Sequence, residues 1–173
     1  NALSRIKIDF KLNEKNENIT YLNGLNVENE IRKLFVADKV SEVSAIVEVR
    51  NAMVGQQRIM GKKSGFVMDG RDIGSVVFPN ADLKIFMTAD PIIRAERRQL
   101  ELIQKGESMD LKEILENIKK RDLIDTSRVN SPLVQADDAV LVDTSFMRLE
   151  EQIEEICLMA DMKISEKSRL GWK

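Results

Sequence analysis

Residues 65–74 read Gly-Phe-Val-Met-Asp-Gly-Arg-Asp-Ile-Gly, and the interpretation of the whole chain starts from them. The apolar residues 66–68 predict a short buried strand, and Arg71 and Asp72 follow it between two glycines. We expect these glycines to allow positive φ angles and a close approach of the backbone to a ligand. Ligands of open α/β sheets bind just past the carboxyl ends of the strands, so this turn is the first candidate site. The alternative is a solvated ion pair in an exposed turn.

The segments on both sides of this turn predict an α/β protein. Strict alternation over residues 5–12, and an Asn-Gly turn after residues 19–22, predict an antiparallel hairpin that residues 25–27 can extend. Two later segments are typical of buried strands, residues 81–87 and 139–143. Helical periodicity and capping residues predict helices over residues 41–59, 91–105, 110–121 and 149–160. Residues 163–173 receive no assignment.

Composition limits the class of protein. The chain has 173 residues, with 27 basic and 29 acidic side chains, so it lacks the basic excess of a duplex-binding domain and no nucleic-acid partner is expected. No apolar run is long enough for a membrane span and no signal sequence is evident, which predicts a soluble cytoplasmic protein. The single cysteine, Cys157, falls in an apolar pattern and is expected to be packed.

The side chains available for chemistry are equally limited. The chain has no histidine and no cysteine cluster, so Ser-His catalysis and a zinc site are both excluded. Arginine, lysine, carboxylates and backbone amides remain, an inventory that suits phosphoryl transfer.

Two further patterns have features of a phosphate site. Residues 55–63 partly match Gly-x-x-x-x-Gly-Lys-[Ser/Thr], but the glycines are one residue too far apart, Lys63 stands where a hydroxyl is required, and the segment follows a helix. It is therefore not read as a phosphate loop. Arginines also bracket the two helices that flank Gly106, where they either form a lid over a ligand or lie on a solvated helix face. These arginines are Arg94, Arg97, Arg98, Arg121 and Arg128.

Longer motifs resemble bacterial cytidylate kinase. They are residues 70–82, Arg94-Ala95-x-Arg97-Arg98, Arg121-Asp122-x-x-Asp125-x-x-Arg128 and Pro132-Leu133, and the resemblance extends to about Ala160. It implies a P-loop nucleoside monophosphate kinase fold, a parallel sheet wrapped by helices with a small antiparallel β insert. It also implies transfer of the terminal phosphoryl group of ATP to CMP or dCMP, with Mg²⁺, giving CDP or dCDP.

The same resemblance implies a domain division and a set of acceptor contacts. Residues 1–37 correspond to the antiparallel part of the nucleotide-binding insert, and residues 38–173 to the remaining core with a lid around 94–128. Ser41, Arg50 and Asp72 fall where the family contacts the cytosine ring. Arg71 and Arg128 fall where it holds the acceptor phosphate.

Further positions match sugar and donor contacts. Arg121 and Asp125 correspond to the family's contacts with the sugar, and Arg97 to a lid arginine near the donor phosphates. Arg97 and Arg128 are thus the expected catalytic arginines. The family's opening strand, phosphate loop and following helix have no counterpart here.

This departure leaves two expectations for the chain. Either it carries the acceptor site and lid of a kinase and is inactive alone, or it is a non-catalytic nucleotide-binding module. In both, the partners are the small molecules ATP, CMP and dCMP, and the protein is expected to be a monomer.

Overall fold

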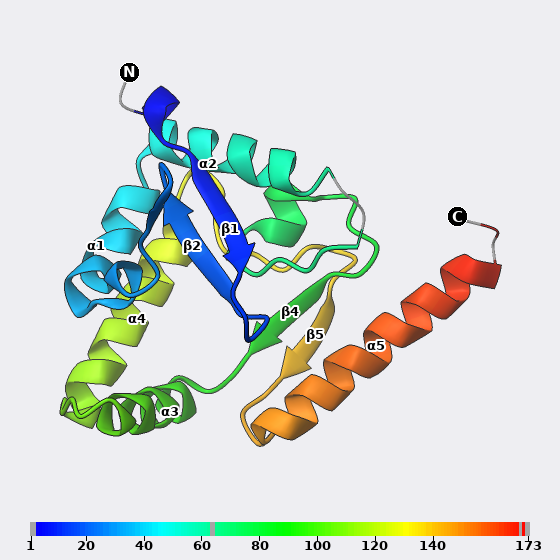
Figure 1. Cartoon of the computed structure of the whole chain (residues 1–173). Helices are drawn as coiled ribbons and strands as arrows, with labels where there is room; N and C mark the ends of the chain where they lie inside the picture. The colour runs from blue at the N-terminus through cyan, green and yellow to red at the C-terminus, as the bar shows by residue number, and fades with distance from the viewer. Residues whose placement is uncertain (1–2, 63–64, 170, 172–173) are drawn as a thin grey trace. The chain divides into compact units, whose positions relative to one another are not determined.

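The structure is a computed structural model that describes residues 3–62, 65–169 and 171. The chain divides into two compact units, which we call the first unit (Asn1–Met68 with Arg128–Asn130) and the second unit (Asp69–Ser127 with Ser131–Lys173). Figure 1 shows the first unit in blue to cyan, apart from its short return segment, and the second in green to red. Each unit has its own sheet.

The first unit contains a three-stranded antiparallel sheet, which confirms the predicted hairpin and its third strand. Its strands are β1 (Ile8–Leu12), β2 (Asn18–Leu22) and β3 (Leu25–Asn26), in the order β1-β2-β3. Asn23 and Gly24 both have positive φ, 50° and 85°, as a two-residue hairpin turn requires. β1 is shorter than the predicted strand because Leu3–Arg5 form a 3₁₀ turn, η1.

The helical part of the first unit differs from its prediction. A short 3₁₀ turn, η2 (Glu30–Arg32), precedes two helices, α1 (Leu34–Ser44) and α2 (Val47–Met60), where one helix from residue 41 was expected. Ile46 interrupts the helix with an extended backbone, ψ 120°. The apolar spacing continues through this break, which is why periodicity alone joined the two helices.

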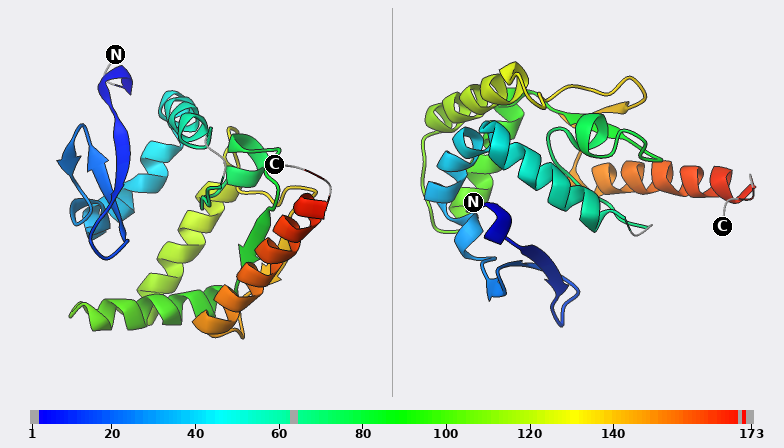
Figure 2. Two further views of the ribbon diagram at one scale, coloured as in Figure 1. Left: turned by 45° about the vertical axis from the view of Figure 1, so that its right-hand side comes forward. Right: turned by 90° about the horizontal axis from the view of Figure 1, so that it is seen from above.

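The second unit holds a parallel strand pair, which confirms two of the predicted strands and shortens both. β4 (Ile85–Thr88) lies beside β5 (Val140–Asp143), with Ile85 opposite Val140 and Thr88 opposite Asp143 (Figures 1 and 2). The strands are less buried than predicted, since β5 buries only Val142. In the described residues the pair has no third strand, and parallel strands depend on neighbours on both sides for their burial.

The predicted strand over residues 66–68 is wrong. These residues have no regular secondary structure, and the side chain of Val67 is fully exposed. Three apolar residues are fewer than the usual strand of five or six, so the run carried little information about pairing.

Two packed helices follow β4. Asp90 caps α3 (Pro91–Gln104) by accepting a hydrogen bond from the amide of Ile92 at 2.7 Å, and Gly106, with φ 77°, follows its end. Both features confirm the prediction. α4 (Leu111–Ser127) begins after its own cap but continues six residues beyond the expected end. Ala95, Leu102 and Ile114 form the buried contact between the two helices.

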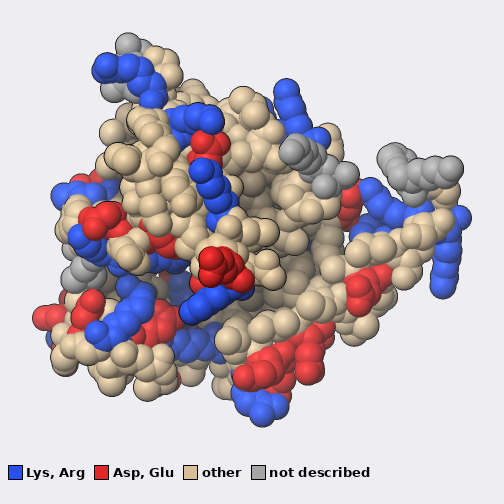
Figure 3. Space-filling model, in the orientation of Figure 1, with Lys and Arg blue, Asp and Glu red and all other residues tan. Residues whose placement is uncertain are grey.

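The last helix, α5 (Leu149–Arg169), includes the predicted segment and part of the unassigned tail. Acidic side chains gather over its first half and basic ones over its end (Figure 3), which suits the helix dipole. Cys157 is exposed, so the expectation of a packed thiol is wrong. Its apolar neighbours in the sequence, such as Ile153 and Leu158, are exposed as well. Among the described residues, no helix is both long and apolar enough to cross a membrane.

Candidate functional site

The arginine–aspartate turn opens the second unit. Asp72 is 1% exposed, whereas the Arg71 side chain keeps 45% of its surface accessible. Directly after them, η3 (Ile73–Val77) is one π-helical turn, in which the amide of Val77 bonds the carbonyl of Asp72 at 3.1 Å. Single π-helical turns are frequent at functional sites. The turn therefore buries the carboxylate and presents the guanidinium.

The two glycines that flank Arg71 and Asp72 leave space that neighbouring side chains occupy. Neither Gly70 nor Gly74 has a positive φ, so that expectation is wrong. A Cβ atom on Gly70 would lie 2.7 Å from Cγ1 of Ile73, and one on Gly74 would lie 3.3 Å from Cδ of Lys84. A side chain at Gly70 would therefore require the side chain of Ile73 to move.

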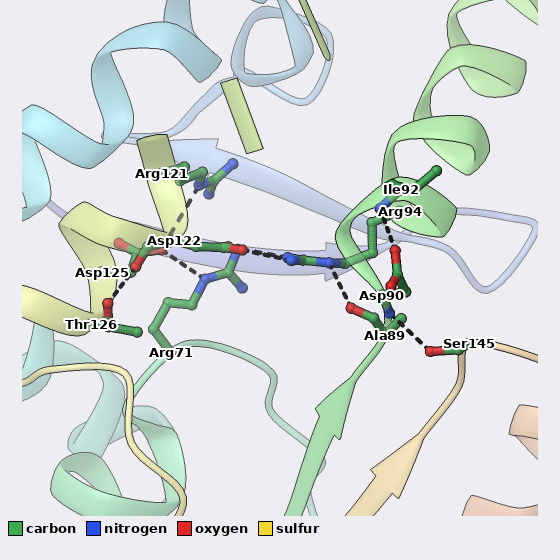
Figure 4. Close-up of polar contacts among 10 residues, drawn as sticks. All are labelled: Arg71, Ala89, Asp90, Ile92, Arg94, Arg121, Asp122, Asp125, Thr126 and Ser145. Carbon is green, nitrogen blue, oxygen red and sulfur yellow. Dashed lines mark hydrogen bonds and ion pairs between the residues drawn. The ribbon is translucent and has the colours of Figure 1, made fainter. Parts of the chain in front are cut away.

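The guanidinium of Arg71 is oriented by a carboxylate from α4. Its Nε donates to Oδ2 of Asp125 at 3.0 Å, across 54 residues of sequence (Figure 4). Asp125 is 3% exposed, and Nε of Arg121 lies 4.0 Å from the same oxygen. Burial, followed by repulsion from Arg71, lowers the pKa of Arg121 from its ordinary value, although an arginine remains charged at neutral pH. The structure thus brings Arg71, Arg121 and Asp125 together.

A second pair lies beside the first. Arg94 on α3 donates to both carboxylate oxygens of Asp122 on α4, at 3.1 and 2.6 Å, and through Nε to the carbonyl of Ala89 at 3.1 Å (Figure 4). Neither Arg94 nor Asp122 was expected to have an individual role in the site. Their occurrence within the quoted arginine-rich motifs was the only available signal.

Arg97, another arginine of α3, bonds the loop after β5. Its guanidinium donates to Oγ1 of Thr144 at 3.2 Å and to the carbonyls of Thr144 and Met147 at 2.5 and 3.1 Å. Thr144 is buried and its Oγ1 donates to the carbonyl of Thr88 at 3.0 Å, so the loop is tied to the end of β4. Thr144 was not among the expected site residues. The only feature of the sequence that indicated a role was its position directly after a predicted strand.

A cavity of about 320 Å³ lies in the second unit at the carboxyl ends of β4 and β5. Its lining is apolar along the strands and charged toward the helices. It comprises Phe86, Met87, Thr88, Ala89, Arg94, Arg97, Asp122, Thr126, Leu133 and Thr144. The position agrees with the general location of ligand sites in open α/β sheets.

The other three expected residues belong to the first unit. Ser41 lies in α1, but its side chain is outside the described residues. Arg50 is half-buried in α2. Arg128 donates through Nη1 to Oγ of Ser44 at 3.3 Å. Within this unit, the residues from Gly55 to Met60 are helical, which supports rejecting a phosphate loop there.

A resident metal ion requires several ligand side chains close together, and the acidic residues are the candidates in this chain. In residues 3–62, 65–169 and 171, no three His, Cys, Asp or Glu side chains are grouped closely enough to hold one. Asp122 and Asp125 are already engaged by arginines. The described residues therefore do not by themselves fit a resident magnesium site.

The second unit as a whole defines a class of protein. A parallel strand pair with arginine–carboxylate pairs at its carboxyl end is typical of α/β proteins that bind phosphorylated ligands. The family model described as cytidylate kinase matches residues 1–162, and the chain belongs to that family.

Curated relatives agree with this assignment. The chain is 56% identical over 159 residues to a cytidylate kinase of Cytophaga hutchinsonii, which covers 91% of the chain and 67% of the relative. It is 58% identical over 152 residues to one of Parabacteroides distasonis, covering 87% and 66%. For the Bacteroides thetaiotaomicron enzyme the identity is 56% over 154 residues, covering 88% and 67%. The chain thus spans about two thirds of the length of these relatives.

Proposed function

We propose that the chain carries the acceptor side of a nucleoside monophosphate kinase that transfers the terminal phosphoryl group of ATP to CMP or dCMP. The products are CDP or dCDP. Membership of the cytidylate kinase family supports this reaction, and the names of its relatives supply the substrate class. The observation that carries the proposal is the pair between Arg71 and the buried Asp125.

This pair suits a phosphate-binding arginine. Asp125 occupies Nε of Arg71, and the two terminal nitrogens have no partner among the described residues. A guanidinium held by its Nε presents those two nitrogens as a fork, which matches two oxygens of a phosphate. The half-exposed position of Arg71 leaves the fork accessible. We therefore assign the acceptor phosphate to Arg71.

We extend the proposal to the other expected residues, with membership of the family as support. Arg128 is proposed to share the acceptor phosphate, and Arg121 and Asp125 to contact the sugar. Arg97 is proposed to act on the donor phosphates, which requires its guanidinium to leave Thr144 and Met147. In the transfer, an acceptor phosphate oxygen forms a bond to the terminal phosphorus of ATP as the bond to the β-phosphate oxygen breaks. The arginines neutralise the negative charge of both nucleotides and align them.

Magnesium enters the proposal only as a companion of ATP. When bound, it would neutralise charge on the donor phosphates. Because the described residues form no group that fits the ion, no step of the transfer is assigned to it here.

Choice of base is assigned to Ser41, Arg50 and Asp72. Cytosine has an amino donor next to a bare ring-nitrogen acceptor, so a carboxylate can accept from the first and a guanidinium can donate to the second. Uracil reverses both groups, and sites of this kind can discriminate by ~10⁴. Asp72→Asn should lose most of the preference for CMP, because an amide can also donate. An unchanged ratio of kcat/KM for CMP and UMP in Asp72→Asn would refute this role.

A second candidate is a nucleotide-binding module without catalysis. No triphosphate-binding loop is assigned within the chain, and we place that loop in the third of the relatives' length that the chain does not match. Without that loop, the positioning of ATP and the stabilisation of its charge are lost together.

We also propose that the protein is a cytoplasmic monomer.

One assay separates the two candidates. A protein of the relatives' full length and the 173-residue chain are each given ATP, Mg²⁺ and CMP, and CDP is measured. We expect turnover of roughly 1 to 100 per second from the longer protein and none from the shorter. The intact mass of both samples is the control. Turnover by a homogeneous 173-residue chain would contradict the assignment of the loop, and no turnover by either protein would favour the module.

A further inference from the structure

The guanidinium of Arg94 joins three elements of the second unit. Its Nε donates to the carbonyl of Ala89, the first residue after β4, at 3.1 Å. Its two terminal nitrogens donate to the two oxygens of Asp122 on α4, at 3.1 and 2.6 Å. Figure 4 shows the side chain of Arg94 between the end of β4 and α4. Each of the three guanidinium nitrogens of Arg94 thus donates a hydrogen bond within the protein, and only the second N–H of each terminal nitrogen is left over.

The partner on α4 is close to the residues assigned to the acceptor nucleotide. Asp122 follows Arg121 directly and precedes Asp125 by three residues, so Asp122 and Asp125 lie on neighbouring positions of the same helical face. Asp125 in turn orients Arg71 at 3.0 Å. Contacts therefore run without interruption from the end of β4, through Arg94 and α4, to the guanidinium of Arg71.

α3 and α4 also pack through an apolar contact that is separate from this pair. The buried residues Ala95, Leu102 and Ile114 hold the two helices together, whereas the side chains of Arg94 and Asp122 remain 35% and 37% exposed. Replacing either side chain leaves that apolar contact complete. A planar fork on a carboxylate, in contrast, fixes both the distance and the orientation of the two groups. The pair is thus suited to setting how α4 is rotated and how far it slides along α3.

We propose that Arg94 and Asp122 are positioning residues for the acceptor nucleotide, because they fix α4 in the register at which Asp125 orients Arg71. This inference rests on the proposed function of that site. Neither residue touches the nucleotide. Their effect reaches it through α4, and a displacement of about 1 Å in such a group can lower a rate by about 10²-fold.

The test uses the protein of the relatives' full length, which we call the full-length protein. Its variants carry Arg94→Lys, Asp122→Asn or both substitutions. Lysine keeps the charge and loses the fork, and asparagine keeps the shape and loses the charge. The matched control is Arg148→Lys, which alters an exposed pair of the same unit, between Arg148 and Glu151 at 3.1 Å. The measurements are the Kd for CMP by calorimetry, KM for CMP and for ATP, and the melting temperature.

We expect each single variant to raise the Kd and KM for CMP by about tenfold or more. The KM for ATP should stay within about twofold, and the double variant should be no worse than the worse single one, because both changes break one contact. Arg148→Lys should leave all four quantities unchanged. Restoration of CMP affinity by Asp122→Glu, which can reform a carboxylate contact, would further support the proposal.

Three results would overturn it. A lower melting temperature with an unchanged Kd for CMP would show that the pair only stabilises the fold. A rise in KM for ATP alone would mean that Arg94 acts on the donor side. If the unmodified protein failed to bind CMP, the proposed function would fail first, and that measurement precedes the variants.

Discussion

The two units use charged side chains in different ways. In the first unit most ion pairs join residues three or four positions apart on the chain surface, as between Lys33 and Glu30 or Lys39 and Glu42. Among the described residues of the second unit, four pairs join distant segments. They are Arg71–Asp125, Lys84–Asp138, Arg94–Asp122 and Lys167–Asp82, and the partners of the first three are separated by 54, 54 and 28 residues.

The difference concerns what each kind of pair can determine. A local exposed pair holds one helical turn that would form without it, and it contributes little free energy because water and salt screen both charges. A pair between distant segments fixes one element relative to another. When one partner is buried, as Asp125 is, loss of the other leaves a charge that water cannot reach. We therefore expect function to depend on the pairs of the second unit.

The largest effect is expected from Asp125→Asn in the full-length protein. The amide keeps the shape but loses the charge that orients Arg71 and offsets its repulsion of Arg121. We expect kcat/KM for CMP to fall by about 10²-fold, with the ratio between CMP and UMP unchanged. Steady-state kinetics with both nucleotides provide the measurement. Asp137→Asn, at an exposed acidic position, is the control and should retain normal activity.

If Asp125→Asn kept its activity, the long-range pair would have no functional role. The comparison between the units would then rest on stability alone.

A smaller effect, on stability, is expected from Lys84→Met. The side chain of Lys84 is 6% exposed, and its ammonium donates to the carbonyl of Pro79 and to both oxygens of Asp138, at 2.7 and 2.8 Å. Methionine fills the space of the stem but leaves that carbonyl without its donor. The free energy of unfolding should fall by about 1–3 kcal/mol in urea titrations. Lys163→Met, at an exposed local pair with Glu166, should change it far less. Equal changes in the two variants would remove the distinction between buried and local pairs.

The same contrast explains how much of the fold the sequence predicted. Turns and caps that depend on one or two residues were correct, as at Asn23-Gly24 and at Asp90 before Pro91. Two predictions that depended on packing against a neighbouring element failed. Residues 66–68 are not a strand and Cys157 is exposed, because an apolar pattern does not say what packs on it.

The candidate site shows the same limit. The sequence located Arg71 and Asp72 in a turn, and family resemblance indicated Asp125, but neither gave the bond between Arg71 and Asp125. That bond depends on where α4 lies relative to the turn. For the same reason the pairing of Arg94 with Asp122 could not be inferred from spacing, since 28 residues separate them.

Glu28 of the first unit has both a local contact within four residues and a contact with a strand, so it tests whether the two kinds of contact behave differently. It accepts from Arg32, four residues away, at 2.7 Å, and from the amide of Thr20 on β2 at 2.9 Å. The hydrogen bond from Arg32, followed by those from Thr20, lowers the pKa of Glu28 from 4.5 to about 2. A carboxyl group with a lowered pKa stabilises the fold above its unfolded pKa. That stabilisation should be complete above about pH 4.5 and should disappear as the pH falls through about 2.

The measurement is an NMR titration of the Thr20 amide between pH 6 and 1.5. Its shift should follow the protonation of Glu28 and should be flat in Glu28→Gln. A midpoint near 4.5 in the unmodified chain would mean that the contact with β2 is not maintained in solution, and that Glu28 behaves as an ordinary local pair.

The smallest effect is expected from Lys39→Gln in α1. Lys39 lies 3.0 Å from Glu42, and both side chains are exposed, at 69% and 56%. Lysine and glutamine have similar helix propensities, so the substitution removes the charge pair and little else. We expect the free energy of unfolding to change by less than about 0.5 kcal/mol, and the change to vanish in 1 M salt. Urea unfolding at low and high salt, with Glu42→Gln and the double variant, measures the coupling directly. A coupling as large as the change caused by Lys84→Met would mean that sequence separation and burial do not distinguish the ion pairs of the two units.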